Sequence, residues 1–376
     1  MKNKQEILGQ YFTKIEIVRD LVNLVFLNKH YKNSIKILEP SFGTGNFIKA
    51  LKEKKFSDIE GCEIDEYLTK NPSDFFNMPF EKKYDLIIGN PPFSKYNLKE
   101  SYFNINEHLK LDALSSVYLT KKELKKDKEK IENIFLLKSL KHLQGNDSSI
   151  GFVLPISFFI KNRNKSIKNE LLKYFSTIII YQNDKAWFDK NIPCCFAFFT
   201  NSDKLKNKIV LLYENGKKNE EVFSTKDIHE ELIPQVVYHK NNGYVKNDKG
   251  TPLTEFFKTQ KINIKKSYKE NNISAKNILE KKIIPENKMI ENYKIAIVRV
   301  GNSSVGKCGL INAKEDVLND MFYIFDVKDQ YVKNKRVKES ICRQINKNID
   351  YFRNITCRVG SKSIKKEDIY NFKISI

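Results

Sequence analysis

The sequence predicts an α/β protein: a Rossmann-like domain with a mostly parallel sheet, followed by a C-terminal α+β domain. Short apolar runs typical of buried strands recur at 35–38, 59–65 and 84–89, and each leads into polar or glycine-containing residues. Helical spacing of apolar residues at 15–26 and 47–53 predicts helices before and between these strands. A chain of 376 residues is long enough for two domains, each with its own core.

The segment after the first predicted strand contains a glycine turn. Residues 39–47 read Glu-Pro-Ser-Phe-Gly-Thr-Gly-Asn-Phe. A strand, a glycine turn and a helix begin a nucleotide-binding α/β unit, because glycine allows positive φ and close approach of the backbone to a ligand. Gly43 and Gly45 lack the third glycine of a dinucleotide fingerprint, and no Gly-Lys-Ser/Thr of a phosphate loop follows. The carboxylate of Glu39 suits a cationic amino-acid ligand better than a pyrophosphate.

Acidic residues follow the second predicted strand. Glu63 lies about 20 residues after the glycine turn, the offset at which a carboxylate can hold both hydroxyls of a ribose. Asp74 and Phe75 supply an acid and an aromatic ring that could grip an adenine. These residues predict a nucleoside site at the strand ends.

The tetrapeptide Asn90-Pro91-Pro92-Phe93 follows the third predicted strand. A fixed Asn oxygen and a backbone carbonyl can accept the two N–H bonds of an exocyclic amine, which frees its lone pair for attack. Proline keeps such a loop rigid and offers no competing N–H, and the Phe ring can stack on a base. The tetrapeptide is typical of amine alkylation, although a proline-stiffened turn is the alternative interpretation.

These motifs, in this order, resemble the S-adenosylmethionine-dependent DNA adenine-N6 methyltransferases of the gamma arrangement. The resemblance implies a class I methyltransferase domain, S-adenosyl-L-methionine as cofactor, and direct methyl transfer to an adenine flipped out of duplex DNA. It assigns cofactor contacts to Tyr11, Thr13, Glu39, Ser41, Gly43, Gly45, Glu63, Ile64, Asp74, Phe75 and Asn90. It assigns catalysis to Asn90, Pro91, Pro92 and Phe93, and contact with the flipped base to Phe93, Phe188 and Lys190. For Phe188, packing in the core with Phe196 and Phe198 is an equal alternative.

The resemblance also implies a domain order. The polar stretch 201–208 sets the predicted boundary, with a catalytic domain at 1–203 and a target-recognition domain at 204–376. Later strands are expected at 150–154, 177–181 and 194–200 in the first domain, and at 209–213, 235–238, 295–300 and 321–327 in the second. Residues 298–302 and 359–369 resemble segments of target-recognition domains. The lysine-rich run 121–130 is either a solvated helix surface or a segment that orders over DNA phosphates.

Three alternatives remain at the level of sequence. Asn-Pro-Pro-Phe also occurs in RNA methyltransferases that act on base amines, which usually lack so long a C-terminal half. A catalytically silent DNA-binding specificity protein could keep the fold, but the intact motifs argue against it. A glutamine-modifying methyltransferase would leave residues 201–376 without a purpose.

Charge and composition define the expected partners and compartment. The formal net charge of +21, from 67 basic and 46 acidic residues, fits a surface that neutralises phosphates of double-stranded DNA, or merely a solvated lysine-rich surface. Six scattered cysteines and five histidines show no ligand spacing, so no metal is expected. No signal-peptide core or run of 18 apolar residues is present, which predicts a cytoplasmic protein without a membrane span. A monomer is expected, with a cognate restriction endonuclease as a candidate partner.

Overall fold

A computed structural model describes the chain in two compact units, residues 1–234 and 235–376. The described residues are 9–97, 128–190, 192–242, 250–258, 273–275, 277–301, 303–316, 320–356 and 363–375. Most of the lysine-rich run 121–130, and parts of the segments 298–302 and 359–369, lie outside them.

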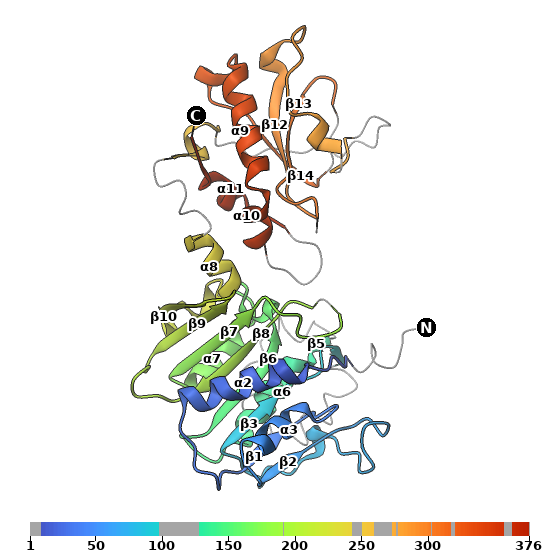
Figure 1. Cartoon of the computed structure of the whole chain (residues 1–376), viewed down its shortest axis with the longest axis vertical. Helices are drawn as coiled ribbons and strands as arrows, with labels where there is room; N and C mark the ends of the chain where they lie inside the picture. The colour runs from blue at the N-terminus through green and yellow to red at the C-terminus, as the bar shows by residue number, and fades with distance from the viewer. Residues whose placement is uncertain are drawn as a thin grey trace. The chain divides into compact units, whose positions relative to one another are not determined.

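The first unit contains an eight-stranded mixed sheet in the order β10-β9-β7-β8-β6-β3-β1-β2 (Figure 1). Its strands are β1 (Ile37–Glu39), β2 (Ile59–Gly61), β3 (Leu86–Gly89), β6 (Ser149–Pro155), β7 (Thr177–Asn183), β8 (Cys194–Thr200), β9 (Lys208–Glu214) and β10 (Lys218–Ser224). Four of the seven neighbouring pairs are parallel: β1–β2, β1–β3, β3–β6 and β7–β9. The predicted fold class is confirmed, together with every strand predicted before residue 201.

Strands β1, β2 and β3 are parallel neighbours, so the residues that follow them meet at one edge of the sheet. From β1 the chain crosses outward to β2 on one side and back to β3 on the other. Such a reversal of strand order opens a crevice at the carboxyl ends, where open α/β sheets bind ligands. The glycine turn, the Glu63 segment and the Asn90 loop all start at this edge.

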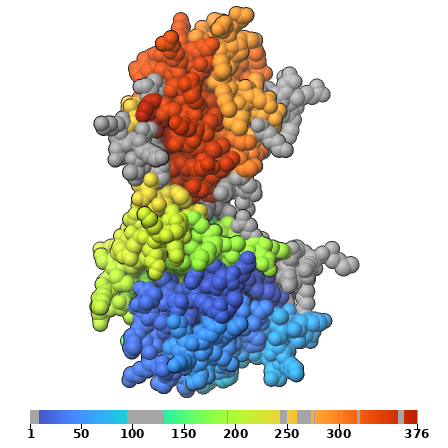
Figure 2. Space-filling model, in the orientation of Figure 1, coloured from blue at the N-terminus to red at the C-terminus, as the bar shows by residue number. Residues whose placement is uncertain are grey.

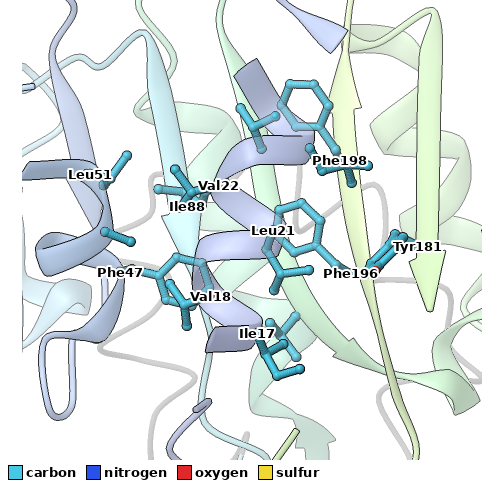
Figure 3. Close-up of a cluster of buried hydrophobic side chains, with 14 of the residues drawn as sticks. Ile17, Val18, Leu21, Val22, Phe47, Leu51, Ile88, Tyr181, Phe196 and Phe198 are labelled. Carbon is cyan, nitrogen blue, oxygen red and sulfur yellow. The ribbon is translucent and has the colours of Figure 1, made fainter. Parts of the chain in front are cut away.

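Helices α2 (Ile15–Asn28) and α3 (Asn46–Glu53) cover one face of this sheet. Leu21 and Val22 of α2 pack with Ile88 of β3 and with Phe196 and Phe198 of β8 (Figure 3). The N-terminal part of the chain, drawn in blue, forms a continuous surface on this side of the unit (Figure 2). Helices α6 (Ile131–Lys141) and α7 (Lys165–Tyr174) lie on the opposite face (Figure 1).

Short elements complete the unit. They are the 3-10 turns η1 (Phe75–Asn77), η2 (Ile156–Phe159) and η3 (Thr225–His229), and the strand pair β4 (Lys95–Asn97) and β5 (Lys128–Lys130). The turn η1 lies between β2 and β3 in the chain, and its Phe75 and Phe76 line the same cavity as Glu39, Glu63 and Asn90 at the carboxyl edge.

The first unit extends past the predicted boundary at 203/204. Residues 209–213, expected in the second domain, lie in β9, which pairs in parallel with β7, and β10 then pairs with β9. The polar stretch 201–208 is therefore a loop inside the sheet, and the compact unit ends at Pro234. A polar loop between two strands and a polar linker between two domains look alike in sequence.

The second unit is an α+β structure built on the antiparallel sheet β13-β12-β14. Its elements are α8 (Pro234–Asn242), β11 (Thr251–Pro252), η5 (Leu253–Glu255), η6 (Asn277–Glu280), η7 (Ile290–Asn292), β12 (Tyr293–Val298), β13 (Cys308–Asn312), β14 (Phe322–Phe325), η8 (Asp329–Tyr331), α9 (Lys335–Lys347), α10 (Ile349–Asn354), α11 (Lys366–Tyr370) and β15 (Lys373–Ile374). The prediction of a strand at 235–238 was wrong, because these residues form α8. A four-residue apolar run does not separate strand from helix, and Pro234 suits the first helical position.

Within the described residues, no helix is long and apolar enough to cross a membrane. The five cysteines in that part of the chain are buried and unpaired by disulfides, and Cys194 and Cys195 lie in the buried strand β8, as predicted.

Lys168 of α7 is a buried lysine whose replacement should stabilise the protein. Its side chain is 1% exposed, and its Nζ has no hydrogen-bond partner among the described residues. Burial lowers its pKa from 10.5 to about 8. The Lys168→Met variant should gain roughly 1–3 kcal/mol in free energy of unfolding at pH 7, since it removes a buried charge that has no hydrogen bond in the described structure and lies 5.8 Å from the ring centroid of Phe159.

The gain should shrink as the pH rises above 8. Between about pH 8 and 10.5 the unfolded state binds the proton and the folded state does not, so stability of the unsubstituted protein rises there. Urea unfolding at pH 7 and pH 9.5 measures both effects. The exposed neighbour Lys165→Met is the control and should change little. An equal gain at both pH values would contradict the explanation.

Candidate active site

A cavity of about 270 Å³ opens at the carboxyl edge of the sheet. Its wall is formed by Gly9, Gln10, Tyr11, Phe12, Thr13, Glu39, Pro40, Ser41, Phe42, Gly43, Thr44, Asn46, Phe47, Glu63, Ile64, Ser73, Asp74, Phe75, Phe76, Asn90, Pro92, Ser94, Ile131 and Phe135. Ten of the eleven predicted cofactor residues are in this set. The exception is Gly45, which adopts φ +77° at the start of α3.

Glu63 ties the glycine turn to the loop after β2. Its two carboxylate oxygens accept hydrogen bonds from the backbone N–H groups of Gly43 and Asp65, each at 2.8 Å. The side chain is 5% exposed. Because each carboxylate oxygen can accept more than one hydrogen bond, a bound hydroxyl can join the backbone donors.

Glu39 places a carboxyl group in the floor of the cavity. It is 2% exposed, and one oxygen accepts a hydrogen bond of 3.2 Å from the N–H of Ile48 in α3. Burial raises the pKa of Glu39 well above its usual range. The Ile48 bond opposes this, and the nearby Glu63 charge adds to it. A ligand cation beside Glu39 would favour the ionised carboxylate.

Residues 9–13 form a strap along the cavity, anchored by four hydrogen bonds to three segments of the chain. The anchoring hydrogen bonds are Phe93 N to Gly9 O (2.9 Å), Gln10 Nε2 to Asp65 Oδ2 (2.9 Å), Asn90 Nδ2 to Tyr11 O (2.5 Å) and Asn46 Nδ2 to Thr13 O (2.8 Å). The strap thus links the Asn90 loop to the cofactor-side loops.

The Asn90 side chain is held in a defined orientation. The Tyr11 carbonyl can only accept, so the Asn90 atom facing it must be the amide nitrogen. The Asn90 Oδ1 atom is then the free end; it is buried and has no hydrogen-bond partner among the described residues. Ser41 Oγ donates to the Asn90 backbone carbonyl at 3.1 Å and fixes the main chain. The site therefore presents an oriented, unsatisfied acceptor.

Three aromatic rings gather at the Asn90 loop. The ring centroids of Tyr11 and Phe93 are 5.9 Å apart, and Phe188 lies 6.2 Å from each, perpendicular to Phe93. Phe188 is 4% exposed and packs in the core cluster that also holds Phe196 and Phe198. Phe188 therefore packs in the core, as the alternative interpretation expected, and its ring also contacts Tyr11 and Phe93, while Lys190 is exposed.

An apolar wall closes the cavity on the η1 side. Asp74 accepts a hydrogen bond from the N–H of Phe76 at 2.8 Å and so starts the turn. Phe75 is 2% exposed, and its ring contacts that of Phe135 of α6 in a tilted arrangement with centroids 5.1 Å apart. Phe76 is half-buried and meets the same ring edge-on.

Several lining residues were not predicted from sequence. Ile131 and Phe135 come from α6, more than 35 residues after the Asn90 loop, and no motif marks them. Phe76 adjoins a predicted pair, but the sequence alone does not show which ring faces the cavity. Pro91 and Phe93 lie beside the cavity and not in its lining.

Two observations test whether the cavity fits S-adenosylmethionine. Thr13 Oγ1 and Asn90 Oδ1 are buried polar atoms of lining residues without protein partners in the described structure. Buried polar groups are normally hydrogen-bonded, so both atoms are available to bind a polar ligand. A carboxyl at one wall, aromatic rings at another and backbone-held Glu63 between them fit an amino acid joined to a nucleoside. Among the described residues, no group of His, Cys, Asp and Glu is arranged to hold a metal ion.

A comparison with protein families matches the first part of the chain. Residues 14–188 match the family of the Eco57I restriction-modification methylase. The matched segment contains every predicted site residue except Tyr11, Thr13 and Lys190.

Relatives of the chain are type II methyltransferases. M.AccI of Acinetobacter calcoaceticus is 24% identical over 275 residues, which cover 62% of this chain and 47% of the relative. M.HincII of Haemophilus influenzae is 29% identical over 193 residues, which cover 50% of this chain and 36% of the relative. The chain therefore spans less than half the length of these relatives.

Two solved structures share the fold. The type IIG restriction endonuclease BpuSI aligns with a TM-score of 0.56 over 97% of this chain and 59% of that protein, at 12% identity. The type IIL restriction-modification enzyme MmeI, solved in complex with DNA, aligns with a TM-score of 0.50 over 99% of this chain and 69% of that protein, at 11% identity. At such identities the likeness concerns the fold alone.

Substitution of Glu63 tests the nucleoside side of the cavity. Glu63→Ala should weaken binding of S-adenosylhomocysteine by about 1–3 kcal/mol, the scale of a lost hydrogen bond to a charged group. Isothermal calorimetry measures it. Glu53→Ala, which removes an exposed ion pair with Arg19 outside this cavity, is the matched control and should bind normally. Unchanged affinity in folded Glu63→Ala would place the ribose elsewhere.

Proposed function

We propose that this protein is an S-adenosylmethionine-dependent DNA methyltransferase that modifies the N6 amine of adenine in duplex DNA, with the gamma order of motifs. The observation that carries the proposal is the oriented Asn90 Oδ1, a buried acceptor without a hydrogen-bond partner among the described residues, in the lining of a cavity that also contains Glu39, Glu63 and Phe75. The methylase-family match of residues 14–188 supports the same reaction class.

In the proposed complex, different residues of the chain bind different parts of the cofactor. Glu39 faces the ammonium group, Glu63 accepts from the ribose hydroxyls, and Asp74 with the Phe75–Phe76 rings holds the adenine. Thr13 Oγ1 is available for the amino-acid end. When bound, the cofactor supplies an electrophilic methyl group on a sulfonium, so the protein needs no metal or nucleophile of its own.

The Asn90 loop prepares the target amine. Asn90 Oδ1 and the Pro91 carbonyl accept the two N–H bonds of the flipped base, which shifts electron density to the nitrogen lone pair. Phe93 offers a ring face for stacking, with Phe188 supporting it edge-on. Because the Asn90 amide is already fixed by the Tyr11 carbonyl, little reorganisation accompanies the reaction.

Methylation of DNA against RNA tests the function. The purified chain, with tritiated S-adenosylmethionine, should label duplex DNA and leave RNA unlabelled. Single-molecule sequencing of host DNA with and without the gene should then reveal N6-methyladenine in one sequence context. Label in RNA alone, or in a base other than adenine, would overturn the proposal.

The second unit is proposed as the target-recognition domain, and residues 1–234 as the catalytic part. A fragment ending at Pro234 should keep cofactor binding but lose site-specific methylation, provided its circular dichroism shows a folded unit. Affinity of the full chain for DNA should fall with salt, with a log–log slope near −0.9 per phosphate neutralised. A folded fragment that methylates the same site would assign recognition to the first unit.

A partner protein and the oligomeric state are two further proposals. A cognate restriction endonuclease fits a chain whose relatives are type II methyltransferases. A monomer is proposed for the enzyme, because methylation of one flipped base requires one cavity; analytical ultracentrifugation tests it.

A further inference from the structure

Lys138 is a buried lysine of α6 that contacts the cavity wall from behind. Its side chain is 0% exposed. The ammonium group donates to the backbone carbonyls of Phe76 at 2.9 Å and Met78 at 3.1 Å. It also lies 4.8 Å from the ring centroid of Phe80 and 5.5 Å from that of Phe75.

Both carbonyls belong to the η1 turn and the residue that follows it. The same turn carries Asp74, Phe75 and Phe76 into the cavity wall. At its start, Asp74 caps the turn through the N–H of Phe76. At its end, Lys138 donates hydrogen bonds to the carbonyls of Phe76 and Met78. A single buried cation thus binds two carbonyls of this backbone segment.

Helix α6 reaches the cavity directly as well. Ile131 and Phe135 line it, and Lys138 follows Phe135 by three residues, on the same side of the helix. The lysine therefore joins the helix to the turn at the point where both form the wall.

We propose that Lys138 is a positioning residue, which holds the Asp74–Met78 segment in the shape that receives the adenine of the cofactor. The inference rests on the proposed cofactor and assigns to Lys138 no contact with substrate. A mere packing residue at this place would be apolar, since burying an ammonium group is costly.

The titration of Lys138 makes its proposed positioning role testable by the pH dependence of adenine binding. Burial lowers its pKa to about 8, and the charge of Asp74 opposes this shift. Two other titratable groups lie near Lys138 in the described structure. Burial lowers the pKa of His142 to about 4 and raises the pKa of Cys62 to about 11. Lys138 is therefore the group in this cluster that loses its charge near pH 8. The neutral amine holds carbonyls more weakly, so adenine affinity should fall as the pH rises through 8.

The experiment uses 5′-methylthioadenosine, the nucleoside half of the cofactor without its amino acid, so that neither the ligand's ammonium nor its partner Glu39 contributes. Calorimetry from pH 6.5 to 9.5 compares the full-length protein with Lys138→Met and Lys138→Arg. Lys138→Met should bind about tenfold more weakly at pH 7, the scale of one lost charged hydrogen bond, and without pH dependence. Lys138→Arg should restore affinity at pH 9.5, because arginine keeps its charge.

Lys338 of α9 supplies a matched control. It is 1% exposed and donates to the carbonyls of Ile290 at 2.8 Å and Tyr293 at 2.7 Å. Burial lowers its pKa to about 8 as well. It lies in the second unit and does not line the cavity. Lys338→Met should therefore leave both the affinity and its pH profile unchanged.

Equal binding by Lys138→Met and the unsubstituted protein would overturn the inference, as would an equal loss in Lys338→Met. If Lys138→Met fails to fold, the pH profile of the unsubstituted protein decides: a flat profile across pH 8 overturns the inference. Failure of the unsubstituted protein to bind both 5′-methylthioadenosine and S-adenosylhomocysteine would instead overturn the proposed function itself.

Discussion

Asn90→Ala should lower the rate of methyl transfer by at least about 100-fold while binding of S-adenosylhomocysteine and DNA persists. The expected loss is that of a preorganised polar group aimed at the reacting atom. Single-turnover kinetics with saturating cofactor separate chemistry from binding. Phe93→Tyr should remain active, because the ring and its stacking are kept.

Two companion variants sharpen the Asn90 test. Asn90→Asp keeps an oxygen but cannot donate to the Tyr11 carbonyl, so it should also be inactive if orientation matters. Asn201→Ala removes another asparagine that donates to backbone carbonyls, those of Asn146 and Tyr174, outside the cavity, and should stay active. Turnover retained in Asn90→Ala would show that the catalytic centre lies elsewhere.

Gly9→Ala should lower kcat/KM by at least about 100-fold. The glycine has φ +66°, and a Cβ atom there would lie 2.7 Å from the backbone carbonyl carbon of Phe93. The strap would have to move away, which breaks the Phe93 N–Gly9 O bond and displaces the Tyr11 carbonyl from Asn90. Misplacement of about 1 Å in a catalytic array costs such a factor.

Gly216→Ala is the matched control for Gly9. It also has positive φ, at +84°, but no atom lies within 4 Å of the added Cβ. Its strain should cost some stability and leave activity intact. If Gly9→Ala keeps full activity with normal cofactor affinity, the strap does not position the Asn90 loop.

Three of the cavity residues that the sequence could predict share one property: each lies at or just after a strand end. Glu39, Glu63 and Asn90 follow β1, β2 and β3, and parallel strands bring their carboxyl ends to one edge. Strand positions are readable from short apolar runs, and motif chemistry then names the side chains.

Other parts of the molecule could not be predicted in this way. Ile131 and Phe135 enter the cavity because α6 packs behind the η1 turn, a contact between segments distant in sequence. Residues 235–238 form α8 and not a strand. The strand prediction failed because a run of four residues is too short to distinguish helical from strand spacing. The polar loop before β9 resembled a linker, since pairing with β7 depends on a partner more than 25 residues away.

The sequence by itself determined the α/β class, the order of the motifs and the residue types at the strand ends, because these depend on local spacing and on chemistry. Only the tertiary structure decided that Tyr11 orients Asn90, that Phe188 belongs to both the core and the aromatic group, and that the first unit reaches Pro234. Those features arise where a hydrogen bond, a ring contact or a strand pair joins residues far apart in the chain, and local pattern carries no information about such pairs.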